Sequence, residues 1–283
     1  MKNIHSRLLL VFIGLPLLFA AILLLDFLHF IGFNFIVILF SGLGAMEFSD
    51  IIRQKLYSIS KPKAFLTGIL LPIAAYISQF PSAPLLLPAI FLFVVLTFIF
   101  ANEIFRRNEA EIGDCLKRVA AHSVITVYPG LFSAAMVYIT SLSEPKLSIV
   151  LFLALVFTND TLAFVSGMLF GKNNRNIFAV SPNKSMAGFI GGLLGCVGGA
   201  FIFSAIFPNY FLYPIAGPII IGAAVSIFSN IGDLFESALK RSAGIKDSGT
   251  IIPGRGGVLD SIDSIIFTAP FFVFIFKIMH QAF

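Results

Sequence analysis

Long apolar runs separated by short charged loops recur along the whole chain of 283 residues. Runs of about eighteen residues are long enough to cross a bilayer as helices, which satisfy their own backbone polar groups in lipid. The pattern predicts an all-α polytopic integral membrane protein with about nine transmembrane helices. We place them at residues 8–25, 28–48, 64–80, 84–101, 119–140, 147–171, 186–207, 210–231 and 264–281.

The basic residues sort between alternate loops. With the N-terminus in the cytoplasm, 17 of the 19 Lys and Arg residues fall on the inner side, and Lys146 and Lys277 are the exceptions. Because inner loops of membrane proteins carry the excess of positive charge, we expect a cytoplasmic N-terminus and an extracytoplasmic C-terminus. The first run, 8–25, resembles a signal peptide, but its length and direct passage into the next run favour a span.

Composition agrees with a membrane protein and limits the partners. The chain is 58% hydrophobic and only 12% charged, and no stretch resembles a separate soluble domain. We therefore expect one membrane domain, 1–283, in two halves, 1–145 and 146–283. The net charge of +5 fits anionic inner-leaflet lipid and requires no nucleic acid. We therefore expect the protein in the inner (cytoplasmic) membrane. The two cysteines, Cys115 and Cys196, do not have the spacing of a metal or redox motif.

An acidic residue inside the sixth span, Asp160, is the first candidate for chemistry. It lies eleven residues before Gly171, so a helix places it roughly 16 Å from the inner end. A carboxylate at that depth usually faces a partner, a cavity or a substrate path. The alternative is a packing contact with a Ser or Thr of a neighbouring helix.

The inner loop that follows is basic and ends at a helix start. It carries Lys172, Arg175, Ser181 and Lys184. Lysines, hydroxyls and backbone N–H groups at a helix start suit an anionic ligand such as phosphate. An ordinary basic loop is the alternative. The glycines of 188–199 have GxxxG spacings, which are typical of close helix packing.

The last inner loop is charged and rich in glycine. Asp233 and Glu236 would share a helix face before it, and Asp260 and Asp263 would share one after it. Folding the loop back brings carboxylates together, and carboxylates with water and substrate phosphates are how Mg²⁺ is usually held. The glycines around Arg255 would let the backbone approach phosphate oxygens. A flexible loop with incidental ion pairs, such as Glu236 with Lys240, is the alternative.

This loop, SALKRSAGIKDSGTIIPGRGGVLDSID from Ser237 to Asp263, resembles the signature of the phosphatidate cytidylyltransferases, or CDP-diacylglycerol synthases. The signature reads S-x-x-K-R-x4-K-D-x-G-x-x-x-P-G-H-G-G-x-x-D-R-x-D. Further likeness lies just upstream in Gly232-Asp233 and Glu236-Ser237, and earlier in Asn159-Asp160, Gly171-Lys172 and the segment 181–188. The resemblance covers roughly residues 155–265, whereas the first 150 residues match only as apolar spans.

The resemblance implies transfer of CMP from CTP to phosphatidate, with pyrophosphate released, at a site that faces the cytoplasm. It implies catalytic roles for Asp233, Asp260, Asp263, Lys246, Asp247 and Asp160. It implies substrate contacts for Lys184, Ser181, Lys240, Arg241, Arg255, Asn159 and Lys172. It implies Mg²⁺, with K⁺ allowed as a companion, on Asp233, Asp260 and Asp263. The implied partners are CTP, phosphatidate, membrane lipids and a second copy of the chain in a homodimer.

Three positions depart from the signature and its surroundings: Arg255 stands for His, Ser261 for Arg and Ala187 for Glu. The cation gained with Arg255 would offset the cation lost at Ser261. The departures are compatible with an inactive paralogue. They are also compatible with a related CTP-dependent lipid-phosphate or polyprenol transferase or kinase on the same scaffold. An ion-coupled, non-enzymatic transporter that uses Asp160 is a further interpretation of the membrane helices.

Overall fold

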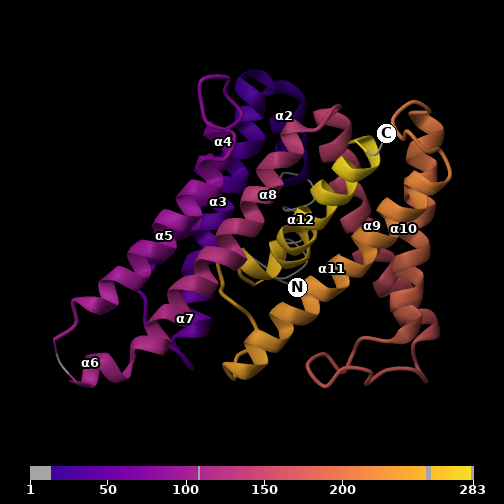
Figure 1. Ribbon diagram of the computed structural model, residues 1–283. Coiled ribbons are helices and arrows are strands. Elements are labelled where there is room, and N and C mark those ends of the chain that lie inside the picture. Colours follow the sequence, from indigo (N-terminus) through magenta and orange to yellow (C-terminus); the bar gives the residue numbers. More distant parts are fainter. Residues whose placement is uncertain (1–13, 108, 253–255, 282–283) are drawn as a thin grey trace. The chain divides into compact units, whose positions relative to one another are not determined.

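The computed structural model describes residues 14–107, 109–252 and 256–281, and these form helices joined by turns (Figure 1). This confirms the all-α class. The elements are α2 (Leu15–Leu24), α3 (Phe27–Ile52), α4 (Lys61–Ile77), α5 (Leu87–Ile104), α6 (Glu109–Gly113), α7 (Cys115–Ile125), the π-helical turn η2 (Thr126–Leu131), α8 (Phe132–Tyr138), the 3₁₀ turn η3 (Ile139–Ser141), α9 (Pro145–Phe170), α10 (Met186–Ile206), α11 (Ala216–Ser242) and α12 (Leu259–Gln281).

Within the described ranges, seven helical segments are long and apolar enough to cross a membrane. They are Phe27–Ile52, Leu87–Ile104, Cys115–Ser141, Pro145–Phe170, Met186–Ile206, Ala216–Ser242 and Leu259–Met279, and each overlaps a predicted span. Of the other two predicted spans, 64–80 corresponds to α4, which has only 17 residues. The span 8–25 overlaps α2 but lies partly outside the described residues. The total of nine therefore stays a prediction.

The largest departure from the predicted boundaries is α11. The apolar run predicted a span at 210–231, but the helix begins at Ala216 and continues to Ser242. Hydropathy indicates only which part of a helix is apolar enough for lipid. The helix itself can continue beyond that part as an amphipathic helix, with its polar residues on one face. Asp233 and Glu236 therefore both lie within the helix, as expected, and Asp233 is nine residues before its end.

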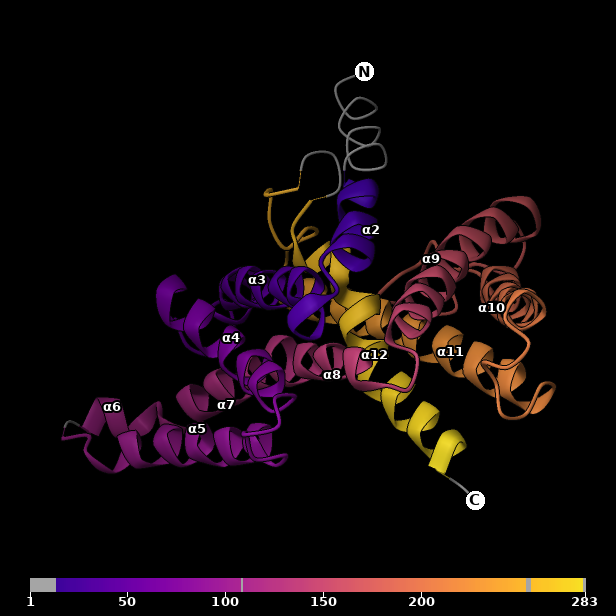
Figure 2. The same cartoon turned by 90° about the horizontal axis from the view of Figure 1, so that it is seen from above.

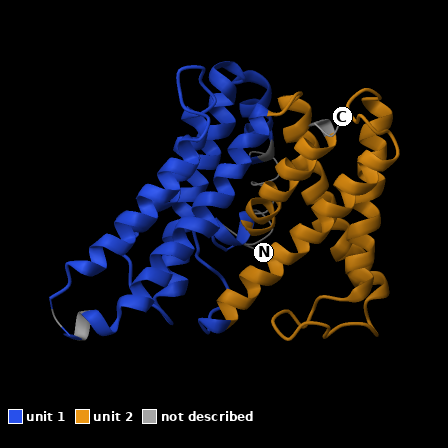
Figure 3. Ribbon diagram, in the orientation of Figure 1, with its two compact units in different colours: residues 1–141, 242–262 blue, residues 142–241, 263–283 orange. Residues whose placement is uncertain are grey.

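The chain divides into two compact units, coloured separately in Figure 3. Unit 1 comprises residues 1–141 and 242–262, and unit 2 comprises residues 142–241 and 263–283. The first boundary lies close to the division suggested at 145. Residues 242–262, which include most of the charged loop, group instead with the N-terminal helices.

In unit 1, helices α3 and α4 pack at small residues. A Cβ added to Gly68 would lie 2.6 Å from the Cβ of Ala45, so only glycine allows this approach. The Ser41 hydroxyl donates to the carbonyl oxygens of Gly68 (2.8 Å) and Pro129 (2.7 Å). Pro129 lies in the π-helical turn η2, so one buried hydroxyl ties α3 to two other elements.

In unit 2, α9 and α10 run side by side (Figures 1 and 2), and the glycines of α10 other than Gly198 face α9. A Cβ at Gly188 would lie 2.8 Å from the carbonyl oxygen of Ala163, and one at Gly192 would lie 2.5 Å from Asn159 Oδ1. The expected packing role of the GxxxG glycines is thus confirmed within one chain.

We predict that Gly192→Ala lowers the thermal stability of the detergent-purified protein. The added methyl would overlap Asn159, and overpacking of this kind costs about 1–3 kcal/mol. The matched control is Gly198→Ala, because a Cβ at Gly198 in the same helix meets nothing within 4 Å and alanine is the better helix former. Equal melting temperatures for the two variants would show that the α9–α10 contact tolerates the methyl.

Candidate functional site

A pocket of about 700 Å³ lies within unit 2. It is lined by the C-terminal half of α9, by the loop that follows it, by the start of α10 and by α11. Three residues predicted from the sequence meet there, namely Asp160, Lys184 and Asp233. The other polar lining residues include Arg175, Asn183, Ser185 and Asn230. The basic loop and the acidic helix positions therefore belong to one cavity.

The charges of the pocket are partly paired. Lys184 Nζ lies 2.7 Å from Asp233 Oδ2, with exposed fractions of 20% and 41% for the two side chains. Ser237 Oγ lies 3.5 Å from the other oxygen of Asp233. A phosphate entering the pocket would offer Lys184 a second anion, and a cation would offer Asp233 a second positive charge. The ion pair thus positions both side chains in the pocket, and each could still bind a second ion of opposite charge.

Asp263 is a buried carboxylate of unit 2. It is 8% exposed, and it feels the negative charges of Asp233 and Asp160 and, in the opposite sense, the positive charge of Lys240. In the described part of the chain, no Lys or Arg lies within ion-pair distance of Asp263. Its Oδ1 accepts the N–H of Ser264 at 2.6 Å. A buried carboxylate near two like charges is stabilised most directly by a cation.

The donor chemistry of unit 2 therefore fits Mg²⁺, a hard ion that prefers carboxylate oxygens. Among the described residues, however, no three His, Cys, Asp or Glu side chains are gathered closely enough to enclose a metal ion. Two carboxylates, water and substrate phosphates make up the usual Mg²⁺ shell, and Asp233 with Asp263 matches that smaller set.

A glycine allows α11 and α12 to approach at this point. A Cβ on Gly232 would lie 2.7 Å from the Cβ of Phe267 and 3.0 Å from the carbonyl oxygen of Asp263. The close approach of the two helices brings Asp233, the residue after this glycine, near Asp263. Gly232 thus has a packing role that determines the geometry of the site.

Asn159 differs from its neighbour Asp160. It is 1% exposed, and its Oδ1 accepts the hydroxyl of Ser226 at 2.7 Å, while its amide donates to Ser229 Oγ at 3.3 Å. Consecutive helical residues point about 100° apart, so Asp160 lines the pocket while Asn159 ties α9 to α11. The buried hydrogen bonds of Asn159 support a role in positioning α9 against α11.

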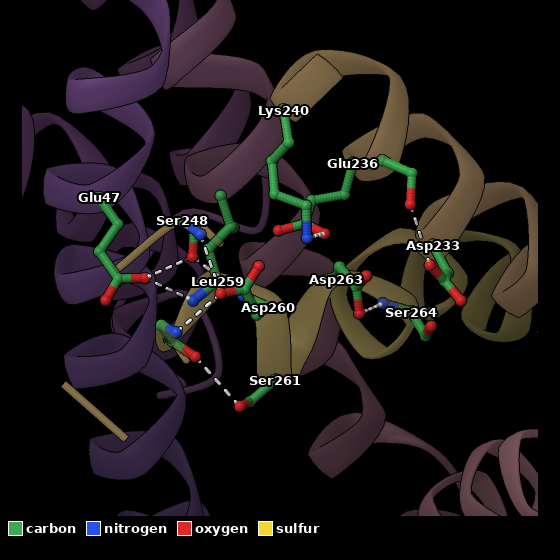
Figure 4. A network of polar contacts seen from close by, with 12 residues as sticks. Glu47, Asp233, Glu236, Lys240, Ser248, Leu259, Asp260, Ser261, Asp263 and Ser264 are labelled. Atoms are coloured by element: carbon green, nitrogen blue, oxygen red, sulfur yellow. Dashed lines mark hydrogen bonds and ion pairs between the residues drawn. The ribbon is translucent and has the colours of Figure 1, made fainter. Parts of the chain in front are cut away.

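A buried acidic residue that the sequence analysis missed, Glu47, organises the charged loop in unit 1 (Figure 4). Its side chain is 4% exposed. Its carboxylate accepts the N–H groups of Val258 (3.0 Å) and Leu259 (2.8 Å) and the hydroxyl of Ser248 (3.0 Å). The signal that singled out Asp160, an acidic residue within an apolar run, was also present at Glu47.

Asp260 clamps the same loop. Its Oδ2 accepts the N–H groups of Ser248 (2.9 Å) and Gly257 (2.7 Å). Gly256 has φ +105°, a conformation that side chains other than glycine rarely adopt. Two of the glycines that were expected to approach substrate phosphates, Gly256 and Gly257, thus lie against the protein's own carboxylates, and Gly254 lies outside the described residues. Asp260 belongs to unit 1 and Asp233 to unit 2, so their joint metal site stays a prediction.

Comparison with known proteins identifies the family of this chain. The cytidylyltransferase family model matches residues 5–279. The chain belongs to the cytidylyltransferase family.

Three relatives align with this chain over different shares of its length. The phosphatidate cytidylyltransferase of Bacillus subtilis is 31% identical over 90% of this chain and 93% of its own length. That of Thermotoga maritima is 36% identical over 58% of this chain and 61% of its own. That of Haemophilus influenzae is 44% identical over 43% of each. The chain thus spans less than two thirds of the last two relatives in these alignments.

The remaining candidate residues are not among the lining residues of the pocket, or lie outside the described residues. Lys240 pairs with the buried Glu236 at 2.5 Å, as expected from their i,i+4 spacing, and its contact with a substrate stays a prediction. Ser261 donates its hydroxyl to the carbonyl oxygen of Gly257 at 3.1 Å. Lys172, Arg241, Lys246 and Asp247 are exposed, and Ser181 is half-buried. Arg255 lies outside the described residues.

We predict that a thiol placed at position 160 is reactive. In a Cys115→Ala background, Asp160→Cys should react with a small water-soluble maleimide at least about tenfold faster than Val156→Cys, because a buried thiol reacts only after local opening. Val156 lies one turn earlier on α9 and is 0% exposed. The background protein, in which Cys196 is buried, is the second control. Equal rates at 156 and 160 would contradict an accessible pocket.

Proposed function

We propose that this chain is a phosphatidate cytidylyltransferase, which transfers CMP from CTP to phosphatidate and releases pyrophosphate. The observation that carries the proposal is the meeting of Asp160, Lys184 and Asp233 at one pocket, three positions that the signature and its surroundings predict. The relatives named above carry this activity in their names. Family membership favours an enzyme over an ion-coupled transporter.

The proposed reaction joins two anions, so positioning and charge neutralisation are the main tasks. A phosphate oxygen of phosphatidate attacks the α-phosphorus of CTP, the new P–O bond forms, and the bond to pyrophosphate breaks. Lys184 and Arg175, which both line the pocket, would bind phosphate oxygens. The lipid phosphate is largely deprotonated near neutral pH, so little general-base help is required.

Carboxylates complete the proposed site. Asp233 and Asp263 would hold Mg²⁺, with Asp160 as a further acidic group near it; K⁺ as a companion ion is the sequence expectation. The bound ion would neutralise charge on the transferring phosphate. Asp233 would then exchange its pairing with Lys184 for the ion, and Lys184 would turn to a phosphate. The buried position of Asp263 excludes water from one side of the site.

The charge distribution supports a place for this site in the cytoplasmic membrane. We propose nine spans, a cytoplasmic N-terminus and a site open to the cytoplasm, where CTP is available. A homodimer is an expectation from the resemblance. The glycine-rich face of α10 is already covered by α9, so a second copy would have to use another surface.

The activity test is purified protein with CTP, phosphatidate and Mg²⁺, assayed for CDP-diacylglycerol and pyrophosphate. Asp233→Asn and Asp263→Asn should each lower kcat by about a thousandfold or more, because each removes a negative ligand at nearly constant shape. The double variant should be about as inactive as either single one.

The matched control is Asp114→Asn, an acidic residue outside the pocket whose carboxylate pairs with Lys117 at 2.9 Å. It should keep normal turnover. Activity in the unmodified protein together with near-normal turnover of both site variants across a Mg²⁺ titration would refute the metal assignment. Absence of CTP-dependent turnover in the unmodified protein would refute the proposed activity itself.

The orientation of the chain in the membrane gives a separate prediction. A reporter active only outside the cytoplasm should be active when fused after Phe283 and inactive when inserted in the loop 173–178, because the basic loops remain inside. A cytoplasmic reporter should show the opposite pattern. Finding both positions on the same side of the membrane would contradict the nine-span topology.

A further inference from the structure

We propose that Glu47 is a positioning residue that controls the conformation of the charged loop and, through Ser248, the carboxylate of Asp260. The proposal concerns residues of unit 1 alone. Its consequence for turnover rests on the proposed cytidylyltransferase activity, whereas its structural part can be tested without any substrate.

The first step is the position of Glu47 between two segments of the loop. Its two carboxylate oxygens accept from Ser248 within the loop and from Val258 and Leu259 at the loop's end. Leu259 is the first residue of α12, where backbone N–H groups lack partners within the helix. A negative charge is favourable at such a helix start. Glu47 therefore closes the loop and caps the helix with one side chain.

The second step is the cost of burying this side chain. A buried carboxylate is stable only if its oxygens are satisfied. In the described part of the chain no Lys or Arg is within ion-pair distance of Glu47, and its hydrogen-bond donors are the three groups of the loop. The loop and Glu47 thus depend on each other: if the loop leaves, three donors are lost to a buried negative charge.

The third step is a relay to Asp260 (Figure 4). Ser248 donates its hydroxyl to Glu47, and the same oxygen accepts the N–H of Asp260 at 3.3 Å. The N–H groups of Ser248 and Gly257 in turn hold Asp260 Oδ2. Orientation of the Asp260 carboxylate therefore depends on the place of Ser248, and that place depends on Glu47.

The fourth step explains two glycines of the signature. A Cβ at Gly249 would overlap the carboxylate of Glu47, and one at Gly257 would overlap both Glu47 and the Ser248 hydroxyl. Neither glycine has a positive φ. Their small size, and not their backbone freedom, is therefore what the structure requires at these two positions, because it lets the loop pass close to Glu47.

The test compares Glu47→Gln with Ser41→Ala in the full-length protein. The glutamine keeps the volume but turns one acceptor oxygen into an N–H donor, which then faces a backbone or hydroxyl donor. Ser41 lies on the same helix, is 0% exposed and ties α3 to α4 and η2 within unit 1. Its hydroxyl bonds to these two elements and not to the loop, so its loss weakens the unit without touching the relay.

Hydrogen exchange measures the structural part. In Glu47→Gln the amides of Val258 and Leu259 should exchange roughly ten- to a hundredfold faster, because each loses a bond to a charged acceptor. The relay predicts that the amides of Ser248 and Gly257, which bind Asp260 and not Glu47, also lose protection. Ser41→Ala should leave all four unchanged. Retained protection at Ser248 and Gly257 in Glu47→Gln would overturn the relay.

Kinetics measures the functional part. Glu47→Gln should lower kcat by about tenfold or more with little change in the KM for CTP, since misplacing a group by about an ångström affects the reacting geometry before binding. Glu47→Gln and Ser248→Ala should be clearly non-additive, whereas Glu47→Gln and Ser41→Ala should add. Normal kcat in Glu47→Gln despite faster exchange would overturn the link to turnover. An inactive unmodified protein would refute the proposed activity and leave the exchange result as the test of the relay.

Discussion

The cost of burying a carboxylate shapes both units of this protein. Charged side chains in an apolar interior are stable only with hydrogen-bond donors, a counter-charge or a metal ion. Glu47 and Asp263 are two such cases, with 4% and 8% of each residue exposed. Glu47 is satisfied by backbone and hydroxyl donors of the loop. Asp263 faces the charges of Asp233 and Asp160, and a cation would satisfy it. One constraint thus yields a structural clamp in unit 1 and a candidate metal ligand in unit 2.

Small residues make these arrangements possible. In unit 2, Gly192 lets α10 approach Asn159, and Gly232 lets α11 approach the backbone of Asp263. In unit 1, Gly249 and Gly257 leave room for the carboxylate of Glu47. Helices in lipid associate through close packing and hydrogen bonds more than through a hydrophobic driving force. The same glycines that allow the helices to pack therefore also bring polar groups together.

The pocket of unit 2 combines opposite charges within one cavity, as chemistry on phosphates requires. Lys184 and Arg175 provide the cations, and Asp160 and Asp233 provide the anions. The 2.7 Å pair of Lys184 with Asp233 keeps the resting charges balanced. In the proposed function, binding a phosphate and a metal ion together would replace this pair by two new ones, so the two ligands would assist each other's binding.

The sequence by itself determined the helical class and the approximate positions of the membrane helices, because lipid leaves an isolated segment no other way to satisfy its backbone. It also determined the main acidic candidates, since Asp160 lies in an apolar run, Asp260 and Asp263 lie in a specific signature and Asp233 lies just before it. Only the tertiary structure decided which side chains meet. It paired Lys184 with Asp233, turned Asn159 inward and Asp160 to the pocket, and brought Glu47 to a loop 201 residues later in the chain. Such contacts depend on helix rotation and packing, which the order of residues along the chain does not reveal.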